Sequence, residues 1–375
     1  MHIYLDNAST TKPCEEAVNA VVRCATENYG NPSSLHKIGL EAEMEVRQAR
    51  KTIAKALGCD AERLLFTSGA TESNNLAIIG TAEAYGRKKK KIVVSSVEHS
   101  CVKQSIVRLE EKGFEVVRIS PVDNVFRPQD FINAVDENTF LVSMMLVNNE
   151  TGYIMPVKQT FSVIKKRFPD VITHCDAVQG FLKIPFKVKD LNADLVSVSG
   201  HKVHALKGTG ALYIKKGVRV VPQIVGGSQE NHRRAGTESV PLIAGFGSAV
   251  EKLFPTMKQR YEKVQKLKTL LKDLIGQTDG IEVNSGDENF SPYIISIAAD
   301  KIRSEIMLHF LESIGIYVSS GSACSKGAKS GVLEEFGIKN PDGTLRISLC
   351  EDNTEEDIKA LVEGLKQGQA TILRK

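Results

Sequence analysis

A lysine at the end of an apolar run is the first candidate for chemistry in this chain. Lys202 stands in the segment SVSGHKVHALKGTGALYI, residues 197–214, four residues after Val198 and directly after a Ser-Gly-His turn. An amine that burial removes from water has a lowered pKa and becomes a nucleophile toward carbonyl groups. Most lysines in turns are solvated, so the neighbouring segments decide between these two interpretations.

Two further polar segments begin where apolar runs end. TSGATESNN, residues 67–75, precedes a helical pattern, and residues 69–71 would present N–H groups to an anion at that helix N-terminus. HCDAVQG, residues 174–180, ends an apolar run with Asp176, and a buried carboxylate needs a cation or strong hydrogen bonds. The first segment is equally consistent with an ordinary helix cap, and the second with an ordinary loop cap.

A cysteine is the second candidate nucleophile. Cys324 lies in YVSSGSACSKGAKSGV, residues 317–332, among small residues that cannot bury a thiol. Lys326 and Lys329 would favour its thiolate, which is the form that attacks. We expect a mobile loop that carries Cys324 into and out of a binding site. An incidental thiol on a surface loop is the alternative.

The elements expected to position these residues form an α/β fold. Helical patterns cover residues 41–57 and 75–85, and Gly58 supplies the stop of the first. Near-continuous apolar character indicates seven buried strands, at residues 64–66, 92–95, 115–119, 140–147, 171–174, 195–198 and 210–214. Such strands, alternating with helices, predict a mostly parallel seven-stranded sheet that is covered on both faces.

The pattern changes after Phe254, where we expect a second, smaller α+β domain. Its predicted helices and strands lie at residues 257–275, 281–283, 293–297, 302–314, 316–319 and 345–349, and from residue 354 onwards. The final helix opens with Thr-Glu-Glu-Asp, a capping-box pattern. We therefore predict a large domain at residues 13–255, and a small domain at residues 1–12 and 256–375 that carries the loop of Cys324.

Ligands of an open α/β sheet bind beyond the carboxyl ends of its strands. The loops at that edge are expected to be residues 67–75, 95–101, 147–152, 174–180 and 197–202, and all five are rich in polar groups. A phosphate-binding helix N-terminus, a carboxylate for a protonated ring nitrogen and a strand-end lysine together indicate a pyridoxal 5'-phosphate site.

Longer motifs occur over almost the whole chain. They are YLDNASTT (4–11), GNPSSLH (30–36), FTSGATESNN (66–75), EHS (98–100), NNETG (148–152), DAVQ (176–179), RAGTES (234–239), SSGSACSKG (319–327) and LRISL (345–349). With these motifs the chain resembles the cysteine desulfurases of the nitrogen-fixation and iron–sulfur-cluster branch, which are fold type I pyridoxal phosphate enzymes of the class V aminotransferase family. The resemblance implies conversion of L-cysteine to L-alanine, with the sulfur held as a persulfide on Cys324 and passed to sulfur-acceptor or scaffold proteins. Iron–sulfur cluster assembly, tRNA thiolation and thiamin synthesis all remain open as destinations of the sulfur.

The resemblance also implies a role for each site residue. Lys202 would hold the cofactor covalently and remove the Cα proton, and His99 would stack on the ring and shuttle protons. The other cofactor contacts would be Ala70, Thr71, Ser199 and His201 at the phosphate, Asp176 at the pyridinium nitrogen, Gln179 at the phenolic oxygen, and Asn149. Asn149 and Arg346 would bind the substrate carboxylate, for which a guanidinium fork is well suited. Thr237 would reach the phosphate of a neighbouring subunit, which implies a homodimer with shared sites.

Three stretches depart from the family pattern. Leu206 stands where relatives often have proline, and Cys350 and Glu351 stand where they commonly have Gly-Arg. GVLEEFGIKNPDG, residues 331–343, takes the place of an expected helix. We expect only a small effect of Leu206 on its turn, and a changed partner surface at Cys350 and Glu351. We expect the third departure to affect the reach of the loop and the choice of sulfur acceptor more than the chemistry.

Three alternatives stay open from the sequence. A transaminase or a selenocysteine lyase of the same fold uses the same cofactor, but a transaminase needs no thiol such as Cys324. A metal-dependent hydrolase could use the His-Cys-Asp run at 174–176, or His201 and His204, although these two histidines lack a nearby third ligand. A scaffold protein could keep the cofactor without the chemistry, but no core motif residue is missing.

Composition and charge limit the expected partners. The chain has 375 residues, of which 42% are hydrophobic and 25% charged, which is typical of a globular protein large enough for two domains. Its net charge is only +4, and the basic run at residues 87–91 is typical of a solvated turn, so direct nucleic-acid binding is not expected. We expect a cytoplasmic protein, because no signal peptide and no apolar run of roughly 18 residues is evident. Seven cysteines without a CxxC pair argue against a disulfide framework and a structural zinc site, and no metal is expected.

Overall fold

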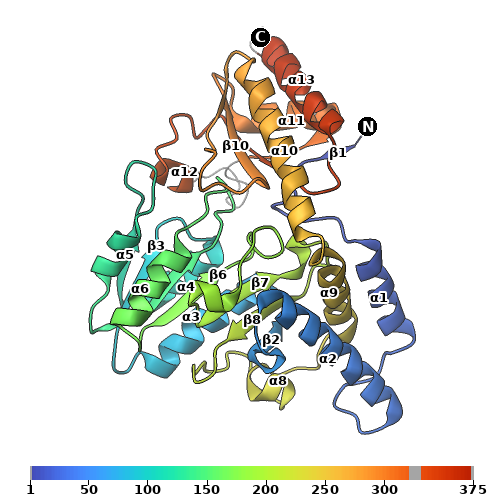
Figure 1. Cartoon of the computed structure of the whole chain (residues 1–375), viewed down its shortest axis with the longest axis vertical. Coiled ribbons are helices and arrows are strands. Elements are labelled where there is room, and N and C mark those ends of the chain that lie inside the picture. The colour runs from blue at the N-terminus through green and yellow to red at the C-terminus, as the bar shows by residue number, and fades with distance from the viewer. Residues whose placement is uncertain (1, 321–330, 373–375) are drawn as a thin grey trace.

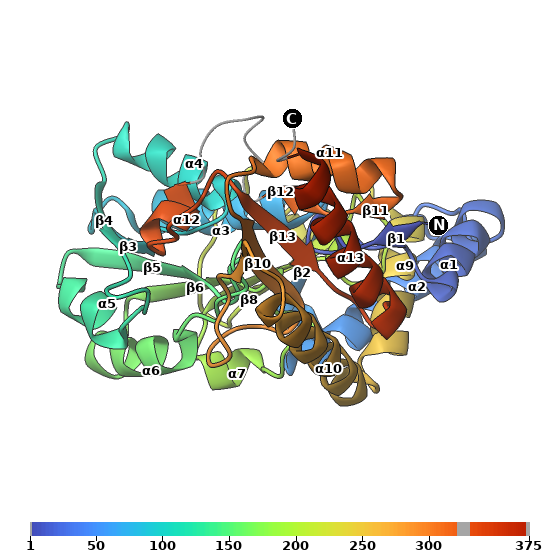
Figure 2. The same ribbon diagram turned by 90° about the horizontal axis from the view of Figure 1, so that it is seen from above.

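The computed structural model describes residues 2–320 and 331–372. Figure 1 shows a larger part around a seven-stranded sheet and, at the top of the view, a smaller part around a four-stranded sheet. Seen from above, in Figure 2, the helices and strands of the smaller part lie over the middle of the larger one. The chain therefore brings a second layer of structure close to one edge of its main sheet.

The large sheet has the strand order β2-β8-β7-β6-β5-β3-β4. Its strands are β2 (Leu64–Thr67), β3 (Lys91–Ser95), β4 (Glu115–Ile119), β5 (Thr139–Met145), β6 (Ile172–Asp176), β7 (Leu195–Ser199) and β8 (Gly210–Ile214). Pairing is parallel except at β8, which runs antiparallel to both β2 and β7. The prediction of a mostly parallel seven-stranded sheet is confirmed.

The reversal at β8 fixes the position of Lys202. The connection from β7 to β8 contains a short 3₁₀ helix, Gly200–Lys202, and Gly210 then pairs with Ser199. An antiparallel pair needs only a short connection, whereas a parallel pair needs a crossover of a dozen or more residues. The turn therefore holds Lys202 at the carboxyl end of β7.

Helices cover both faces of the large sheet. On one face α3 (Ala70–Tyr85) packs beside α4 (Ser100–Glu110), over a core that includes Leu141. The neighbouring residue Val142 points to the other face, into a second core. The helices of the larger part that contribute to this second core are α1 (Glu15–Thr26), α2 (Lys37–Leu57), α5 (Pro128–Ala134), α6 (Val157–Arg167), α7 (Val188–Leu191) and α9 (Val240–Leu253). Over residues 2–320 and 331–372, no helix has both the length and the apolar character that a membrane crossing requires.

The smaller sheet is antiparallel, with the strand order β12-β13-β10-β9. Its strands are β9 (Ile281–Val283), β10 (Ile294–Ala299), β12 (Ser319–Ser320) and β13 (Thr344–Ser348), and its helices are α10 (Met257–Gly276), α11 (Ser304–Ser313) and α13 (Glu355–Ile372). The predicted capping box of α13 forms, because Thr354 Oγ1 accepts from Asp357 N at 3.2 Å while Asp357 Oδ2 accepts from Thr354 N at 3.1 Å.

Residues 3–11 connect the two parts. β1 (Ile3–Tyr4) pairs with β11 (Ile316–Tyr317), and Ser348 N donates to Leu5 O at 2.7 Å. A few residues later, Thr11 N donates to His201 O at 2.9 Å, at the turn that holds Lys202. The first residues therefore pack against the smaller part, as expected, while the domain boundaries near residues 12 and 255 stay a prediction.

Four local predictions differ from the structure. α2 begins at Lys37 instead of 41, because His36 Nδ1 caps it by accepting from Gly39 N at 3.2 Å. α3 begins at Ala70 instead of 75, since the polar residues of its first turn conceal the apolar periodicity. The single strand predicted at residues 316–319 is wrong, because β11 and β12 pair in separate sheets. A short helix, α12 (Gly331–Glu335), forms where the sequence appeared to lack one, and it buries Val332 and Leu333.

A largely buried ion pair holds β2 in place just before the polar loop of residues 67–75. Arg50, on α2, donates to both carboxylate oxygens of Glu230, with Nη2 at 2.6 Å from Oε1. Glu230 also accepts from Phe66 N at 3.1 Å, and its side chain is only 3% exposed. The carboxylate of Glu230 thus accepts hydrogen bonds from the largely buried guanidinium group of Arg50 and from the buried N–H of Phe66.

We predict that Glu230→Ala lowers the free energy of unfolding by about 3 kcal/mol, because it leaves the largely buried guanidinium group of Arg50 without the carboxylate that balances its charge. Urea denaturation followed by circular dichroism measures the change. Glu41→Ala is the control, since Glu41 pairs with Lys37 at 3.7 Å on the exposed surface and its loss should cost less than about 1 kcal/mol. Equal effects of the two substitutions would contradict the prediction.

Candidate active site

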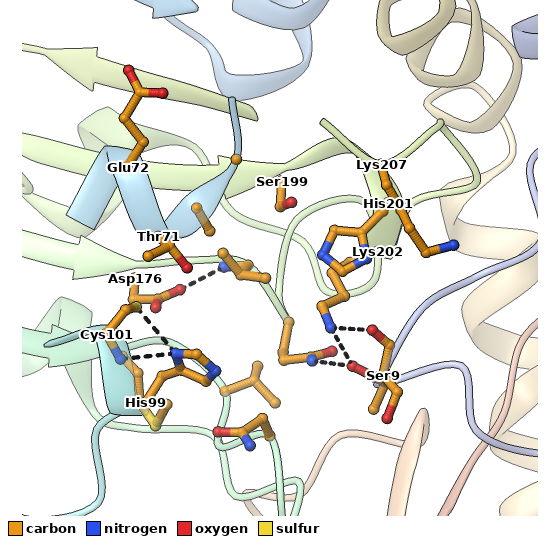
Figure 3. A pocket seen from close by; sticks show the side chains of 18 of the residues that line it. Ser9, Thr71, Glu72, His99, Cys101, Asp176, Ser199, His201, Lys202 and Lys207 are labelled. Atoms are coloured by element: carbon orange, nitrogen blue, oxygen red, sulfur yellow. Dashed lines mark hydrogen bonds between the residues drawn. The ribbon is translucent and has the colours of Figure 1, made fainter. Parts of the chain in front are cut away.

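A cavity of about 520 Å³ opens at the carboxyl ends of the parallel strands, between the large sheet and the N-terminal segment. Its walls include ten of the residues singled out from the sequence: Ala70, Thr71, His99, Asn149, Asp176, Gln179, Ser199, His201, Lys202 and Arg346. Figure 3 shows how side chains from loops that follow different strands face this common space. The structure brings these residues together as expected, and their individual roles stay predictions.

Lys202 reaches the cavity from the turn after β7 and is half-buried. Its Nζ donates hydrogen bonds to the carbonyl oxygens of Ala8, at 2.7 Å, and Ser9, at 2.5 Å (Figure 3). Both carbonyls belong to the segment that Thr11 fastens to the same turn. The amine is therefore held by protein acceptors in a defined position, unlike a solvated lysine.

Asp176, the last residue of β6, is held by two hydrogen bonds. Oδ2 accepts from Asn74 Nδ2 at 2.7 Å, and Oδ1 accepts from Val178 N at 3.0 Å. Asn74 is itself fixed by His174, whose Nε2 lies 3.1 Å from Asn74 Oδ1. Burial lowers the pKa of His174 to about 3, so the ring is neutral and its Nε2–H donates while Nδ1 accepts from Ser143 Oγ at 2.8 Å. This chain keeps the amide NH₂ of Asn74 directed at Asp176.

Asn74 belongs to the motif TSGATESNN, for which the sequence predicts an anion site or an ordinary helix cap but no contact with Asp176. Asn74 lies four residues after Ala70 and three after Thr71, so it is on α3, one turn into the helix. A contact with Asp176, 102 residues later, leaves no signal in a single sequence. The structure is needed to assign it.

His99 precedes α4 and caps it. Its Nδ1 accepts from Cys101 N at 3.2 Å, so a neutral ring carries its proton on Nε2. Burial lowers the pKa of His99, and the nearby carboxylate of Asp176 opposes that shift only in part. The ring lines the cavity beside Asp176, with Nε2–H as the group that the cap does not use (Figure 3).

The N-terminus of α3 forms another wall of the cavity. No side chain caps this helix, so its first N–H groups, including those of Ala70 and Thr71, are suited to an anion. Ser199 Oγ lines the same cavity and is buried without a hydrogen-bond partner in the described parts of the chain. Buried hydroxyl groups are usually paired. A bound phosphate would satisfy these donors, so the residues present fit the phosphate group of pyridoxal phosphate.

A glycine allows the turn at Gly69, just before α3, to lie against β8. A Cβ at Gly210 would be 2.7 Å from Gly69 Cα and 2.8 Å from Val198 O, both of which are backbone atoms. Real Cβ atoms essentially never approach so closely. The glycine at position 210 therefore has a specific cause, the close contact between the turn after β2 and the start of β8.

His201 and Gln179 have partners that the sequence did not indicate. Burial lowers the pKa of His201 to about 4, with the charge of Lys202 as a second cause, and its Nδ1 lies 3.2 Å from Thr10 Oγ1. Gln179 Nε2 donates to Ala8 O at 2.9 Å, and Oε1 accepts from Lys183 Nζ at 3.0 Å. The second hydrogen on Gln179 Nε2 is therefore available to donate to a ligand.

Arg346 extends from β13 into the cavity and is 4% exposed. Nη1 donates to the carbonyl oxygen of Asn149 at 2.9 Å, and Nη2 donates to Asp6 Oδ1 at 2.9 Å and to Ser9 Oγ at 2.6 Å. Its Nε has no partner within residues 2–320 and 331–372. The guanidinium group is therefore held in place by three residues from two segments. A carboxylate ligand would compete with Asp6 for it.

Thr237 and Cys324 are not among the cavity residues that the structure describes. Thr237 is exposed and does not line the cavity, although the neighbouring Arg234 pairs with Glu72 of the cavity wall, with Nε 2.9 Å from Oε1. Cys324 lies outside the described residues. The roles assigned to both stay predictions.

The other cysteines are poor nucleophiles. Burial raises the thiol pKa at each of the six that the structure describes, which are Cys14, Cys24, Cys59, Cys101, Cys175 and Cys350. A thiolate is the reactive form, and these groups are thiols at neutral pH.

The metal-hydrolase alternative lacks a ligand set at the cavity. Within the described ranges, the one group of three suitable side chains close enough to share an ion is His204, Cys350 and Glu351, none of which lines the cavity. His174 is engaged with Ser143 and Asn74 instead.

This combination of a mostly parallel sheet, a small antiparallel layer and a lysine beyond β7 defines a class of proteins. The family model for aminotransferase class V matches residues 3–361, and the chain belongs to this family, whose cofactor is pyridoxal phosphate. Cysteine desulfurase IscS of Methanosarcina thermophila is 39% identical over 367 residues, covering 96% of this chain and 90% of the relative. Cysteine desulfurase IscS of Dictyoglomus turgidum is also 39% identical, over 372 residues, covering 97% and 94%.

Solved structures show the same similarity. A NifS-like protein superposes with a TM-score of 0.94 at 34% identity, covering 99% of this chain and 100% of that one. SspA in complex with cysteine superposes with a TM-score of 0.82 at 32% identity, covering 93% and 99%.

Glu98 is a buried carboxyl group beside the site that sequence reasoning did not single out. Its Oε1 accepts from Ser95 Oγ and, at 2.8 Å, from Met145 N. Its Oε2 is buried without a hydrogen-bond partner in the described ranges. Burial raises the pKa of Glu98 from 4.5 to about 7. Between these two pH values the folded protein keeps a proton on Glu98 that the unfolded chain releases.

We predict that Glu98→Gln is more stable than the wild type above pH 7. The folded wild type binds more protons than the unfolded chain between about pH 4.5 and 7, so its stability falls as the pH rises through this range. A neutral amide has no such proton to lose. The advantage of the variant should grow from near zero at about pH 4.5 to about 2–3 kcal/mol at about pH 8. Urea denaturation at several pH values measures it, and a pH-independent difference would count against the prediction.

Proposed function

We propose that this protein is a pyridoxal phosphate-dependent cysteine desulfurase, which converts L-cysteine to L-alanine and an enzyme-bound persulfide. The observation that carries the proposal is the cavity in which the amine of Lys202, the carboxylate of Asp176 and the N-terminus of α3 meet. Relatives named cysteine desulfurase, which match nearly the full chain, support the choice of reaction. The neighbour whose structure contains cysteine supports the choice of substrate.

The cavity residues have the chemistry to hold the cofactor. Lys202 would bind it covalently, and Asp176 would pair with its ring nitrogen. The N-terminus of α3, together with Ser199 and His201, would bind its phosphate, and His99 would contact its ring. When bound, the cofactor supplies an electron sink for bonds at the Cα of the amino acid.

The chain's own residues bind and orient L-cysteine and move its protons. Arg346 binds the substrate carboxylate, and Asn149, whose carbonyl oxygen holds that guanidinium group, keeps it oriented. Lys202, once it is released from the cofactor, is the general base for the Cα proton. His99 presents Nε2–H as a hydrogen-bond and proton donor on the same side of the cavity as Asp176.

We assign the acceptor of the sulfur to Cys324. Its support is the motif SSGSACSKG, together with the raised thiol pKa of the six other cysteines. The thiolate of Cys324 attacks the substrate sulfur, an S–S bond forms and the Cβ–S bond breaks. The carbon that loses sulfur takes up a proton, so cysteine and a protein thiol give alanine and a protein persulfide without an external oxidant or reductant.

The proposal extends to partners. Thr237 is exposed and lies three residues after Arg234, which pairs with the cavity wall, and this position is consistent with a contact to the phosphate of a neighbouring subunit. We therefore propose a homodimer with shared sites, and sulfur-acceptor or scaffold proteins as recipients of the persulfide sulfur.

We predict that Cys324→Ser still binds pyridoxal phosphate but loses sulfide formation from L-cysteine by at least about 100-fold, because a hydroxyl is a far weaker nucleophile than a thiolate and holds no persulfide. The assay measures alanine and sulfide from holoprotein with a reductant, and wild type should form them in equal amounts. Without reductant, mass spectrometry should find one added sulfur on the wild-type peptide that contains Cys324.

Two variants serve as controls for this experiment. Cys59→Ser, at a partly exposed thiol outside the cavity, should keep the wild-type rate. Lys202→Ala should lose both turnover and the borohydride-reducible lysine adduct of the cofactor. Sulfide release by Cys324→Ser at the wild-type rate would refute the desulfurase assignment.

We also predict that Arg346→Ala raises the apparent KM for L-cysteine at least about tenfold, since the loss of a charged hydrogen-bonding partner costs about 1.5–3 kcal/mol. Steady-state kinetics on cofactor-loaded protein measure the change. Arg303→Ala is the control, because Arg303 belongs to the same smaller part of the structure but is 72% exposed and outside the cavity. An unchanged KM with normal turnover in Arg346→Ala would exclude carboxylate binding by this residue.

A further inference from the structure

Lys183 is a buried lysine to which the proposed reaction assigns no role. It lies in a run of turns after β6, four residues beyond Gln179, and is 5% exposed. It does not line the active-site cavity, so it cannot touch a ligand there. Its Nζ donates to Gln179 Oε1 at 3.0 Å. Burial of an amine costs hydration free energy. Because Lys183 is buried and contacts a cavity residue, it is a candidate for positioning that residue.

The amide of Gln179 is fixed at both of its polar atoms. Nε2 donates to Ala8 O at 2.9 Å, and Oε1 accepts from Lys183. If the amide were reversed, Oε1 would face the carbonyl oxygen of Ala8, and two acceptors would meet with no hydrogen between them. The observed orientation leaves the second hydrogen of Nε2 available, and Gln179 lines the cavity.

Lys183 is a donor in both of its protonation states. Burial, followed by the charge of Lys202, lowers its pKa to about 7, yet a neutral amine and an ammonium group both carry N–H. The other titratable or charged groups that face the amine are Glu351, Cys350 and Arg346, and the ring centroid of Tyr293 lies 5.9 Å from Nζ. The hydrogen bond to Gln179 is therefore available on both sides of neutral pH.

We propose that Lys183 is a positioning residue of the active site, which holds the Gln179 amide so that an N–H points to the place where an anionic ring oxygen binds. The inference rests on the proposed function, because the phenolic oxygen of pyridoxal phosphate is the anion concerned. A hydrogen bond to an oxyanion stabilises the deprotonated form. Through Gln179, Lys183 therefore lowers the pH at which the bound cofactor loses its proton.

The test is a pH titration of the visible absorbance of the holoprotein in the absence of substrate. Lys183→Met keeps the length of the side chain but removes the donor, and it should raise the midpoint of the titration by about 1–2 pH units. Lys268→Met is the matched control. Lys268, on α10, is also buried and donates to Gly286 O at 3.0 Å, but it does not line the cavity, so this variant should keep the wild-type midpoint.

A double-mutant cycle separates action through Gln179 from a direct effect of charge. Gln179→Leu alone should raise the midpoint, and the addition of Lys183→Met should raise it no further, because the donor that Lys183 orients is already absent. If Lys183→Met does not fold, Lys183→Leu gives the same test, since it also removes the donor and the charge from the buried space.

Each outcome decides one of the two proposals. If the wild type binds no pyridoxal phosphate with visible absorbance, the proposed function fails. If the wild type binds the cofactor but the Lys183 variant keeps the wild-type midpoint, the positioning role is overturned while the proposed function stands. If the midpoint shifts of Gln179→Leu and Lys183→Met add in the double variant, action through Gln179 is also excluded.

Discussion

The structure depends on one short segment, residues 5–11, that is hydrogen-bonded to both sheets at once. Leu5 is bound to the small layer through Ser348, and Thr11 is bound to the turn after β7. Between them, the carbonyl oxygen of Ala8 accepts from both Lys202 and Gln179, while Ser9 and Asp6 accept from Arg346. Backbone carbonyls and one carboxylate of this segment therefore organise the donors that face the cavity, and the two sheets cannot shift relative to each other without breaking these contacts.

Desolvation sets the chemical state of much of the site. Burial lowers the pKa values of the histidines at 99, 174 and 201, so these rings are predominantly uncharged near neutral pH. Burial also raises the pKa of Glu98 to about 7, so this carboxyl group keeps its proton in mildly acidic solution. Each neutral ring then has a defined donor and a defined acceptor atom, which gives the hydrogen-bond network a direction. Ser143, His174 and Asn74 form such a directed chain toward Asp176. The site is thus preorganised by the orientation of dipoles as much as by charge.

The large sheet could be predicted from the sequence because all of its strands except the edge strand β4 are buried on both faces and therefore give nearly continuous apolar runs. The lysine, the carboxylate and the polar loop of residues 67–75 could be placed at one edge, because parallel strands end at the same side. Contacts across long separations could not be predicted. The bond between Lys202 and Ala8 spans 194 residues, and that between Arg346 and Asp6 spans 340, and neither has a local pattern. The strand near residue 317 was misjudged for a related reason: its apolar run is continuous, but the chain changes sheets within it.

The pairing of Leu5 with Ser348 also has a consequence for the order of events during synthesis. On the ribosome, Leu5 is made 343 residues before its partner, which at typical elongation rates is roughly 20–70 seconds. The large sheet, whose strands lie between residues 64 and 214, is complete in the nascent chain long before β13 exists. During that interval, residues 5–11 can bond to Gln179 and to the turn after β7, but not to β13. The cavity therefore acquires its full set of walls only when the last part of the chain has left the ribosome, and the nascent enzyme stays inactive until its translation is almost finished.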